Sequence, residues 1–510
     1  MTLPRDFEEY TRRLMGDELY TTLAEGLAQE APTSIRLNPF KTTSCLHHDG
    51  QTAGPRQGSP VAWCAQGFYL ANRPNFTFDP LLHAGLYYVQ EASSMFIGHI
   101  LQQLIHHPVL MLDLCAAPGG KTTAARAALP EGSLLFANEP MKLRASILSE
   151  NVQKFGHPDM VVTNNFPREY QQSGLLFDVV LVDVPCSGEG MFRKDEGAIG
   201  EWSMQNVEKC RLLQRSIIED IWPCLAEGGI LIYSTCTFNA HENEENVNWI
   251  ADNLGADFID IDTPPEWGIT GSLIDDHPVC RFIPGKTKGE GLFVAVLRKR
   301  GQHVPAIEQL KANTGKSGKK QRRQQLRKQD SLPSEVSCRA WVNGQFTISR
   351  KQGTVMGIPT WWQHIYEHAQ KSLHILHAGM TLGTEKGHGI IPHTSLALSQ
   401  AIAPDAFPRI EADYKTAISY LRKEAIALPP DAPRGFVIIT YRSHSLGFVK
   451  NIGNRANNLY PQEWKIKSTY LPEHPIEVLP DTCCTQATHS LSPHRESLPE
   501  SQLKEELPSQ

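Results

Sequence analysis

Short apolar runs alternate with stretches of helical periodicity through the middle of the chain. Strands that alternate with helices in this way are typical of βαβ units and a parallel sheet. Between the fourth and fifth runs, residues 204–225 carry apolar side chains at helical spacing, so they are predicted to form a crossover helix that Gly228 and Gly229 end. We therefore predict an α/β domain at 106–300. Its six expected strands are 109–114, 134–139, 160–164, 177–184, 229–235 and 291–298.

The segments on either side have other patterns. Residues 1–105 mix helix and turn signals and are predicted to be an N-terminal extension, while 334–475 are predicted to form a second domain. Residues 301–333 are interpreted as a basic linker, either a solvated tether or an RNA contact. Pro, Ser, Glu and Thr dominate 476–510, which we expect to be a disordered tail. The linker's basic residues are Lys311, Lys316, Lys319, Lys320, Arg322, Arg323, Arg327 and Lys328.

Composition narrows the class of protein. With 510 residues, 40 % hydrophobic and 20 % charged, the chain has the profile of a globular protein of two or three domains. It has neither an apolar run of membrane-spanning length nor an N-terminal signal peptide, so we expect a cytoplasmic protein without a membrane partner. The eleven cysteines include no C-x-x-C pair, and no metal site is expected. A net charge of -6 argues against a surface coated in positive charge, but a local basic groove suffices for nucleic acid.

A turn of small residues follows the first predicted strand. The segment from Asp113 to Thr122 places small residues where a first strand meets a first helix, which lets the backbone approach a ligand closely. Glu139 ends the second run roughly 20 residues beyond Gly119, where a dinucleotide-type fold places the acid that binds ribose hydroxyls. We therefore expect a cofactor that contains adenosine. The residues of the turn predicted to bind it are Cys115, Ala116, Ala117, Pro118, Gly119, Gly120 and Lys121.

A phosphate-binding P-loop is the competing interpretation of this turn. Gly120, Lys121 and Thr122 match the end of the G-x-x-x-x-G-K-[ST] motif, and Asp183 ends a strand as a magnesium-binding acid does. The motif's first glycine falls at Cys115, however, so the phosphate cradle is incomplete. G-x-G-x-x-G is absent as well, which disfavours a plain NAD site.

Two of the predicted strands are followed closely by a cysteine. Cys186 comes after the fourth strand and Cys236 directly after the fifth. The carboxyl ends of strands in an open α/β sheet face the ligand crevice, so the two thiols are expected to meet over one substrate. A thiolate that adds to carbon 6 of cytosine makes carbon 5 able to accept a methyl group, and Asp183 is placed to hydrogen-bond the ring. For each cysteine alone, a buried structural role is the better interpretation, and spacing does not say which one is the nucleophile.

The segment beyond Cys236 contains a helix-start signal. Asn239 and Glu242 have the spacing of a capping box, so we expect a helix to begin there. Its positive end would lie close to Cys236 and favour the thiolate.

These motifs resemble the RNA cytosine carbon-5 methyltransferases of the NOL1/NOP2/Sun family. The resemblance covers about 30–300, and residues 444–464 resemble the PUA-like C-terminal domain of the family's bacterial ribosomal-RNA members, which points to the subfamily F type acting on small-subunit ribosomal RNA. The matching stretches are Cys-Ala-Ala-Pro-Gly-Gly-Lys-Thr at 115–122, Asp-Val-Pro-Cys-Ser-Gly-Glu-Gly-Met-Phe-Arg-Lys-Asp at 183–195, Ser-Thr-Cys-Thr at 234–237 and Lys-Thr-Lys-Gly-Glu-Gly at 286–291.

The resemblance implies both a fold and an activity. The fold is a Rossmann-like class I methyltransferase sheet with an N-terminal extension and a C-terminal α+β/β PUA-like RNA-binding domain, and the cofactor is S-adenosylmethionine. By analogy Cys236 is the nucleophile, Cys186 assists product release, Asp183 contacts base and cofactor, and Glu139 binds the ribose. The product would be 5-methylcytosine in RNA. An inactive RNA-binding assembly factor and a tRNA methyltransferase remain the alternatives, and DNA is not an expected partner.

The chain departs from the family pattern at three positions. Phe166 stands where many relatives place an acid near the adenine, with Asn165 as its nearest polar substitute. Val184 replaces an alanine and Gly285 a histidine, and neither change touches the proposed chemistry.

Basic and aromatic residues suggest where RNA is held. The basic residues expected at the mouth of the crevice, each with a solvated surface charge as its alternative, are Arg193, Lys194, Arg281, Lys286 and Lys288. In the second domain, basic residues alternate with Tyr460 and Trp464, a mixture suited to backbone and stacking contacts, whereas Trp361 and Trp362 are expected in the core. Those basic residues are Lys450, Arg455, Lys465 and Lys467.

Overall fold

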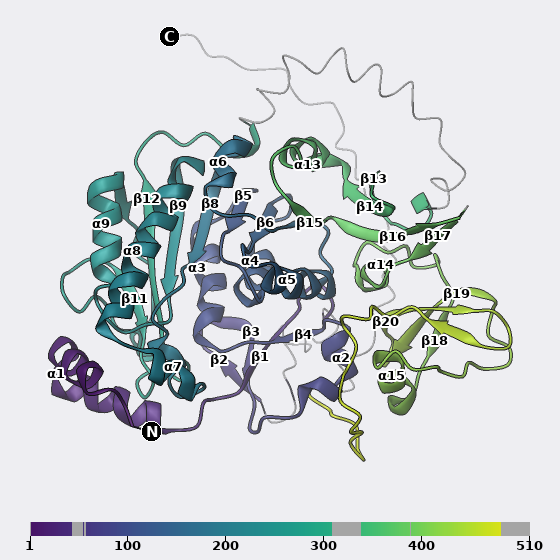
Figure 1. Ribbon diagram of the computed structural model, residues 1–510, viewed down its shortest axis with the longest axis horizontal. Helices are drawn as coiled ribbons and strands as arrows, with labels where there is room; N and C mark the ends of the chain where they lie inside the picture. The colour runs from purple at the N-terminus through teal and green to yellow at the C-terminus, as the bar shows by residue number, and fades with distance from the viewer. Residues whose placement is uncertain (1, 43–54, 56–57, 309–337, 388, 481–510) are drawn as a thin grey trace, which may run out of the picture.

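A central sheet organises the molecule. The computed structural model describes residues 2–42, 55, 58–308, 338–387 and 389–480 (Figure 1). Within these residues the sheet has nine strands in the order β10-β12-β9-β8-β5-β6-β7-β15, with β11 paired to β12. Strands β5 to β9 are parallel, and β12 runs antiparallel to β9. The bounds are β5 Leu110–Asp113, β6 Leu134–Asn138, β7 Met160–Thr163, β8 Phe177–Asp183, β9 Leu225–Thr235, β10 Ala256–Phe258, β11 Val279–Phe282, β12 Leu292–Lys299 and β15 Ile375–Ala378.

Helices cover both faces of this sheet. One buried cluster contains Tyr170 of α6, Ile217 of α8 and Val247 of α9, and a second contains Phe96 of α3 and Leu148 of α5. Burial on two faces explains why the parallel strands are continuous apolar runs in the sequence. The α/β class, all six predicted strands and the crossover helix are confirmed. The prediction that Gly228 and Gly229 end this helix is wrong, because it ends at Ile221 and both glycines lie inside β9. The helices are α3 Phe96–Leu104, α4 Gly120–Ala128, α5 Lys142–Phe155, α6 Glu169–Ser173, α7 Glu196–Glu201, α8 Met204–Ile221 and α9 Glu244–Leu254.

The N-terminal extension forms a small antiparallel sheet beside the central one. Its strand order is β2-β3-β1-β4, and a helix kinked at Gly16 precedes it (Figure 1). Asn38 donates its Nδ2 to Phe155 O of α5 at 2.9 Å, and Arg36 donates to Thr123 of α4, so the extension is hydrogen-bonded to these two helices. The elements are α1 Arg5–Ala28, β1 Ser34–Leu37, β2 Ser59–Val61, β3 Cys64–Tyr69, α2 Pro80–His83 and β4 Tyr87–Val89.

The C-terminal region contains two further four-stranded sheets, in green to yellow in Figure 1. Their orders are β13-β14-β16-β17 and β18-β19-β20-β21. One strand of this region, β15, pairs antiparallel with β7 and completes the central sheet, which the sequence patterns did not predict. The elements besides β15 are β13 Phe346–Lys351, β14 Thr354–Pro359, α13 Gln363–Ala369, β16 Met380–Lys386, β17 Gly389–Pro392, α14 Thr394–Leu398, β18 Arg409–Glu411, α15 Tyr414–Leu421, β19 Gly435–Tyr441, β20 His444–Asn451 and β21 Ala456–Asn458.

The first residues of the predicted linker and tail are packed against the folded protein. Ala306 is buried and its N–H donates to Asp178 Oδ1 at 2.8 Å, so the start of the linker segment packs on the central domain. Val478 and Leu479 are likewise buried. The eight basic residues of the linker and residues 481–510 of the tail lie outside the described residues. No helix in the described part of the chain is long and apolar enough to cross a membrane.

Candidate active site

The sulfur atoms of Cys186 and Cys236 lie 3.1 Å apart. Cys236 directly follows β9 and Cys186 follows β8, and these strands are parallel neighbours in which Asp183 is paired with Ser234. Both side chains are partly buried. The strands therefore bring the two predicted thiols to one point at the carboxyl edge of the sheet.

Two buried carboxyl groups join the loops that carry the thiols. Glu189 Oε2 accepts the N–H groups of Phe238 at 2.6 Å and Asn239 at 3.0 Å, and Glu242 Oε2 accepts the Ser187 N–H at 3.0 Å. Burial raises the pKa of Glu189, and burial together with the charge of Glu189 raises the pKa of Glu242 to about 7. From the sequence, no role was expected for Glu189. The pattern that could have identified it is an acidic residue between two glycines, Gly188 and Gly190, in the loop that carries Cys186.

Gly190 lets the two loops come close together. Its N–H donates to Cys236 O at 2.7 Å, and a Cβ at this position would lie only 2.4 Å from the same oxygen. Any side chain here would push the two cysteine loops apart.

The helix after Cys236 begins later than predicted. Asn239 and Glu242 bond reciprocally, N–H to Oδ1 and Nδ2 to Oε1, both at 2.9 Å, but they close a turn, and α9 starts at Glu244. The prediction that this pair starts the helix is therefore wrong.

A hydrogen bond with Cys236 and burial raise the pKa of the Cys186 thiol well above its ordinary value, so this sulfur keeps its proton near neutrality.

The turn of small residues opens α4. Gly119 takes the left-handed conformation, with φ 113°, as the residue before the helix, and Ala116 donates its N–H to Asn138 O at 2.8 Å. Arg144 Nη2 bonds Ala117 O at 3.0 Å, which holds the turn against α5. Burial raises the pKa of Cys115, so this third cysteine at the site is a neutral thiol.

Charged groups meet at the start of this helix. Lys121 Nζ lies 2.9 Å from Asp183 Oδ2, and Ser234 Oγ donates to Asp183 Oδ1 at 2.8 Å. Although burial opposes a charged amine, the carboxylates of Asp183 and Glu91 raise the pKa of Lys121. The ammonium group of Lys121 is therefore retained beside Asp183.

Asp113 presents a carboxyl oxygen that is not hydrogen-bonded. Thr122 Oγ1 donates to Oδ2 at 2.6 Å, whereas the buried Oδ1 has no hydrogen-bond partner among the described residues. Burial raises the pKa of Asp113 to about 7. A ligand with a cationic donor would satisfy this oxygen.

Two cavities flank Asp183 and Cys115, which line both. The larger, of about 570 Å³, is also lined by Glu139, Met141 and Phe166. Glu139 is buried, accepts the Met141 N–H at 3.0 Å on Oε1, and has Arg144 3.6 Å from Oε2. The other, of about 330 Å³, is lined by residues that include Asp113, Lys121, Glu91, Tyr88 and Cys236. The acid predicted to bind ribose and the predicted nucleophile thus lie in adjoining cavities.

Phe166 and Asn165 have different surroundings. Phe166 is 56 % exposed at the rim of the larger cavity. Asn165 is buried, and its Oδ1 accepts the His374 N–H at 3.0 Å, which attaches the segment before β15. Because the side chain of Asn165 is buried in this hydrogen bond, it does not replace the missing acid at the cavity.

Two arginines expected at the mouth of the crevice are instead buried in ion pairs. Arg193 Nε lies 2.7 Å from Glu290 Oε2, and Arg281 pairs with Glu244. The expectation that these two contact RNA is therefore wrong, because each guanidinium is already neutralised inside the protein.

The lysines of this group remain nearer the surface. Lys194 lies 3.1 Å from Glu290 Oε1 with a side chain 35 % exposed, and it lines the smaller cavity. Lys286 bonds Thr270 at an exposed position, and Lys288 lies over the ring of Tyr69. Of the predicted lysines, Lys194 is the one that borders the active-site cavity.

The aromatic residues of the C-terminal region belong mostly to its core. Tyr460 and Trp464 are buried, so they are not stacking surfaces as expected. Trp362 is fully buried, which confirms the core prediction, whereas Trp361 is 38 % exposed. The predicted basic residues Lys450, Arg455 and Lys467 are exposed.

A doubly wound sheet with a small-residue turn that opens a helix and an acid after β6 is the arrangement that binds an adenosine-containing cofactor. Together with the family matches that follow, it makes the chain an S-adenosylmethionine-dependent methyltransferase. Residues 103–298 match the family described as 16S rRNA methyltransferase RsmB/F, residues 3–92 the N-terminal domain of 16S rRNA methyltransferase RsmF, and residues 407–466 the methyltransferase RsmF PUA domain. The chain belongs to the ribosomal RNA small subunit methyltransferase F family.

Relatives and solved structures agree with this assignment. Ribosomal RNA small subunit methyltransferase F of Serratia proteamaculans is 30 % identical over 483 residues, which cover 90 % of this chain and 96 % of the relative. The protein of the same name from Vibrio cholerae serotype O1 is 28 % identical over 485 residues, 91 % of this chain and 98 % of the relative. The crystal structure of PH0851 shares the fold, with a TM-score of 0.52 at 23 % identity over 58 % of this chain and 66 % of that one.

Proposed function

We propose that this chain forms 5-methylcytosine in small-subunit ribosomal RNA through a transient bond between Cys236 and carbon 6 of the base. The observation that carries the proposal is the 3.1 Å contact between the two sulfurs beside Asp183, at the boundary of two cavities. The RNA class follows the name of the relatives, ribosomal RNA small subunit methyltransferase F.

The residues around the two cavities fit S-adenosylmethionine. Glu139 would accept the ribose hydroxyls, the turn at 115–120 would face the methionine part, and the unpartnered Oδ1 of Asp113 would accept its ammonium group. The apolar rim of Met141 and Phe166 suits the adenine ring. When bound, the cofactor supplies an electrophilic methyl group on a sulfonium centre.

Lys121 supports the formation of the Cys236 thiolate. The ammonium of Lys121 and the sulfur of Cys236 line the same cavity, and the negative thiolate is stabilised by a nearby cation. The Cys186 thiol, which keeps its proton, can donate an S–H hydrogen bond to a thiolate at Cys236, whose sulfur lies 3.1 Å away. Both contacts favour the nucleophilic form.

The covalent step then follows from ordinary pyrimidine chemistry. The Cys236 thiolate bonds to carbon 6 while N3 takes a proton from solvent, and the new N3–H donates to the Asp183 carboxylate. Carbon 5 becomes the nucleophile that receives the methyl group. Loss of the carbon 5 proton to water re-forms the C5–C6 double bond, expels the Cys236 thiolate and releases the N3 proton. The Cys186 thiol stabilises the departing sulfur.

Separate alanine variants of the two cysteines test this assignment. With ribosomal RNA and labelled S-adenosylmethionine, C186A should accumulate a covalent protein–RNA band, while C236A should give neither band nor 5-methylcytosine by bisulfite sequencing. C210A, at a partly buried cysteine of α8, is the matched control and should behave as the unaltered chain. A trapped band with C236A would reverse the assignment. RNA affinity without transfer would favour an assembly factor, and transfer to tRNA alone would change the substrate.

A further inference from the structure

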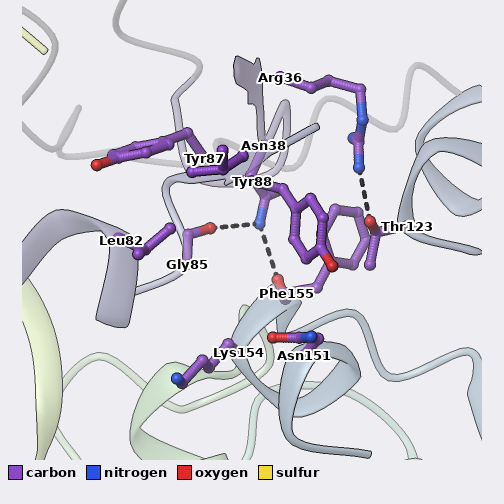
Figure 2. Close-up of a pocket in the computed structure, with 11 residues that line it drawn as sticks. Arg36, Asn38, Leu82, Gly85, Tyr87, Tyr88, Thr123, Asn151, Lys154 and Phe155 are labelled. Carbon is purple, nitrogen blue, oxygen red and sulfur yellow. Dashed lines mark hydrogen bonds between the residues drawn. The ribbon is translucent and has the colours of Figure 1, made fainter. Parts of the chain in front are cut away.

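A third cavity lies between the N-terminal sheet and helices α4 and α5 (Figure 2). Its volume is about 240 Å³, below the range of drug-sized ligand pockets and suited to a single base. Arg36 of β1 and Tyr88 of β4 contribute one side, and Asn151 and Lys154 of α5 the other. In the view of Figure 2, Arg36 stands at the top and Asn151 and Lys154 at the bottom.

Arg36 is a buried cation without an acidic partner. Its residue is 3 % exposed, and it donates Nε to Gln90 Oε1 at 2.8 Å and Nη2 to Thr123 Oγ1 at 2.6 Å. No carboxylate is among its hydrogen-bond partners in the described part of the chain, and Nη1 has no such partner there. Because an uncompensated buried charge is costly, this guanidinium is poised to accept an anion.

Tyr88 connects this cavity to the active site. Its side chain lines both this cavity and the one that contains Cys236, and Val89 does the same. A Cβ on Gly120 of the cofactor turn would lie 3.3 Å from Tyr88 Cε1, so the ring packs directly on that turn. The third cavity is therefore the immediate neighbour of the place where the target base would enter.

We propose that this third cavity receives the nucleotide that adjoins the target cytidine in the RNA strand, with its base against Tyr88 and a phosphate at Arg36. The proposal rests on the proposed function, because a strand whose one base enters the catalytic cavity must continue beside it. An aromatic ring next to an unpaired guanidinium suits single-stranded RNA, which stacks its bases on aromatic side chains and carries a charge at every phosphate.

The experiment compares two Asn→Asp substitutions in the full chain. N151D places a carboxylate at the cavity, and N253D makes the same change at an exposed position of α9, where the side chain also donates Nδ2 to a backbone carbonyl. With protein-free small-subunit ribosomal RNA, N151D should raise the KM for RNA about tenfold, the loss expected for one disfavoured contact. All constants of N253D should stay within about twofold.

N151D could weaken RNA binding directly at the cavity or indirectly through the cofactor turn, because Asn151 also donates to Pro118 O of that turn. Calorimetric measurement of S-adenosylhomocysteine binding separates these two effects. An equal loss of S-adenosylhomocysteine and RNA affinity in N151D would show action through that turn and would overturn the proposal. A ring-preserving pair adds a second readout: Y88F should keep the KM for RNA, and Y88L should raise it.

Photo-crosslinking distinguishes failure of this proposal from failure of the proposed function. Ribosomal RNA that contains 4-thiouridine should crosslink to Tyr88 or to residues 151–155. The crosslink without methyl transfer would count against the catalytic proposal and support the cavity. Methyl transfer with an unchanged KM in N151D and no such crosslink would overturn the proposal for the third cavity.

Discussion

The Glu189 carboxylate accepts the N–H of Phe238 at 2.6 Å and thereby ties the loop after β8 to the loop after β9. Each loop carries one of the paired cysteines, so the distance between the sulfurs depends on this buried acid. The same carboxyl group also bonds the backbone and side chain of Asn239. Several donors thus rely on one side chain.

Replacing this acid should destabilise the fold. E189A leaves the buried donors of Phe238 and Asn239 without an acceptor, and we expect the free energy of unfolding to fall by about 3 kcal/mol. Urea unfolding followed by circular dichroism measures the loss. E219A, at an exposed position of α8, should change stability by less than about 0.5 kcal/mol. Equal stability of E189A and E219A would contradict the role given to Glu189.

Mild oxidation should join the two cysteines. Diamide takes two electrons and two protons from the thiols of Cys186 and Cys236, whose sulfurs need to approach by about 1 Å to form a disulfide. We expect loss of two mass units in the peptides that hold them, loss of methyl transfer, and recovery of both with dithiothreitol. C210A should still form the bond, whereas C186A should not. Intact thiols after treatment would show that the loops hold them apart.

The exposed ring of Phe166 should contribute to cofactor binding. Removing it in F166A takes apolar surface from the rim of the larger cavity. We expect the binding free energy of S-adenosylhomocysteine to weaken by about 1 kcal/mol, which corresponds to roughly fivefold weaker binding. Calorimetry measures the dissociation constant. L143A removes a side chain that is 83 % exposed and does not line that cavity, so it serves as the control. Equal affinities of F166A and L143A would place the adenine elsewhere.

His393 should make the C-terminal region sensitive to acid. Burial lowers its pKa to about 4, and its neutral Nδ1 accepts the Ser395 N–H at the start of α14. The unfolded chain binds this proton near pH 6.5, so stability should fall as the pH drops from 6.5 toward 4, by up to about 1.4 kcal/mol per pH unit. H393N keeps a capping acceptor without the titration and should reduce that slope in urea unfolding at pH 4.5 to 7. The part that remains belongs to other buried histidines such as His377, whose pKa burial also lowers to about 4. The exposed H374N is the matched control, and an unchanged slope in H393N would refute the assignment.

Local patterns predicted most of the fold and the central feature of the site. The apolar runs became strands because both faces of a parallel sheet are buried, and the cysteines met because their strands are neighbours. The start of α9 was misplaced because Asn239 and Glu242 satisfy each other in a turn, which has the same spacing as a helix cap.

Long-range pairings were not visible in the sequence. Arg193 and Arg281 look like any surface arginine until Glu290 and Glu244 are brought beside them by the fold. Pairing of β15 with β7 joins residues more than two hundred positions apart, and no local period reports such a partner. The sequence likewise does not show that Arg36 is buried without a carboxylate partner among the described residues, because this depends on the surrounding fold.

The pairing of β15 with β7 sets a limit on how the enzyme can be shortened. A protein that ends near residue 300 would expose the free edge of β7, a template on which a second molecule can add its own strand. Such a fragment should self-associate, and a minimal catalytic unit needs residues 375–378, or a peptide that replaces them, to remain monomeric.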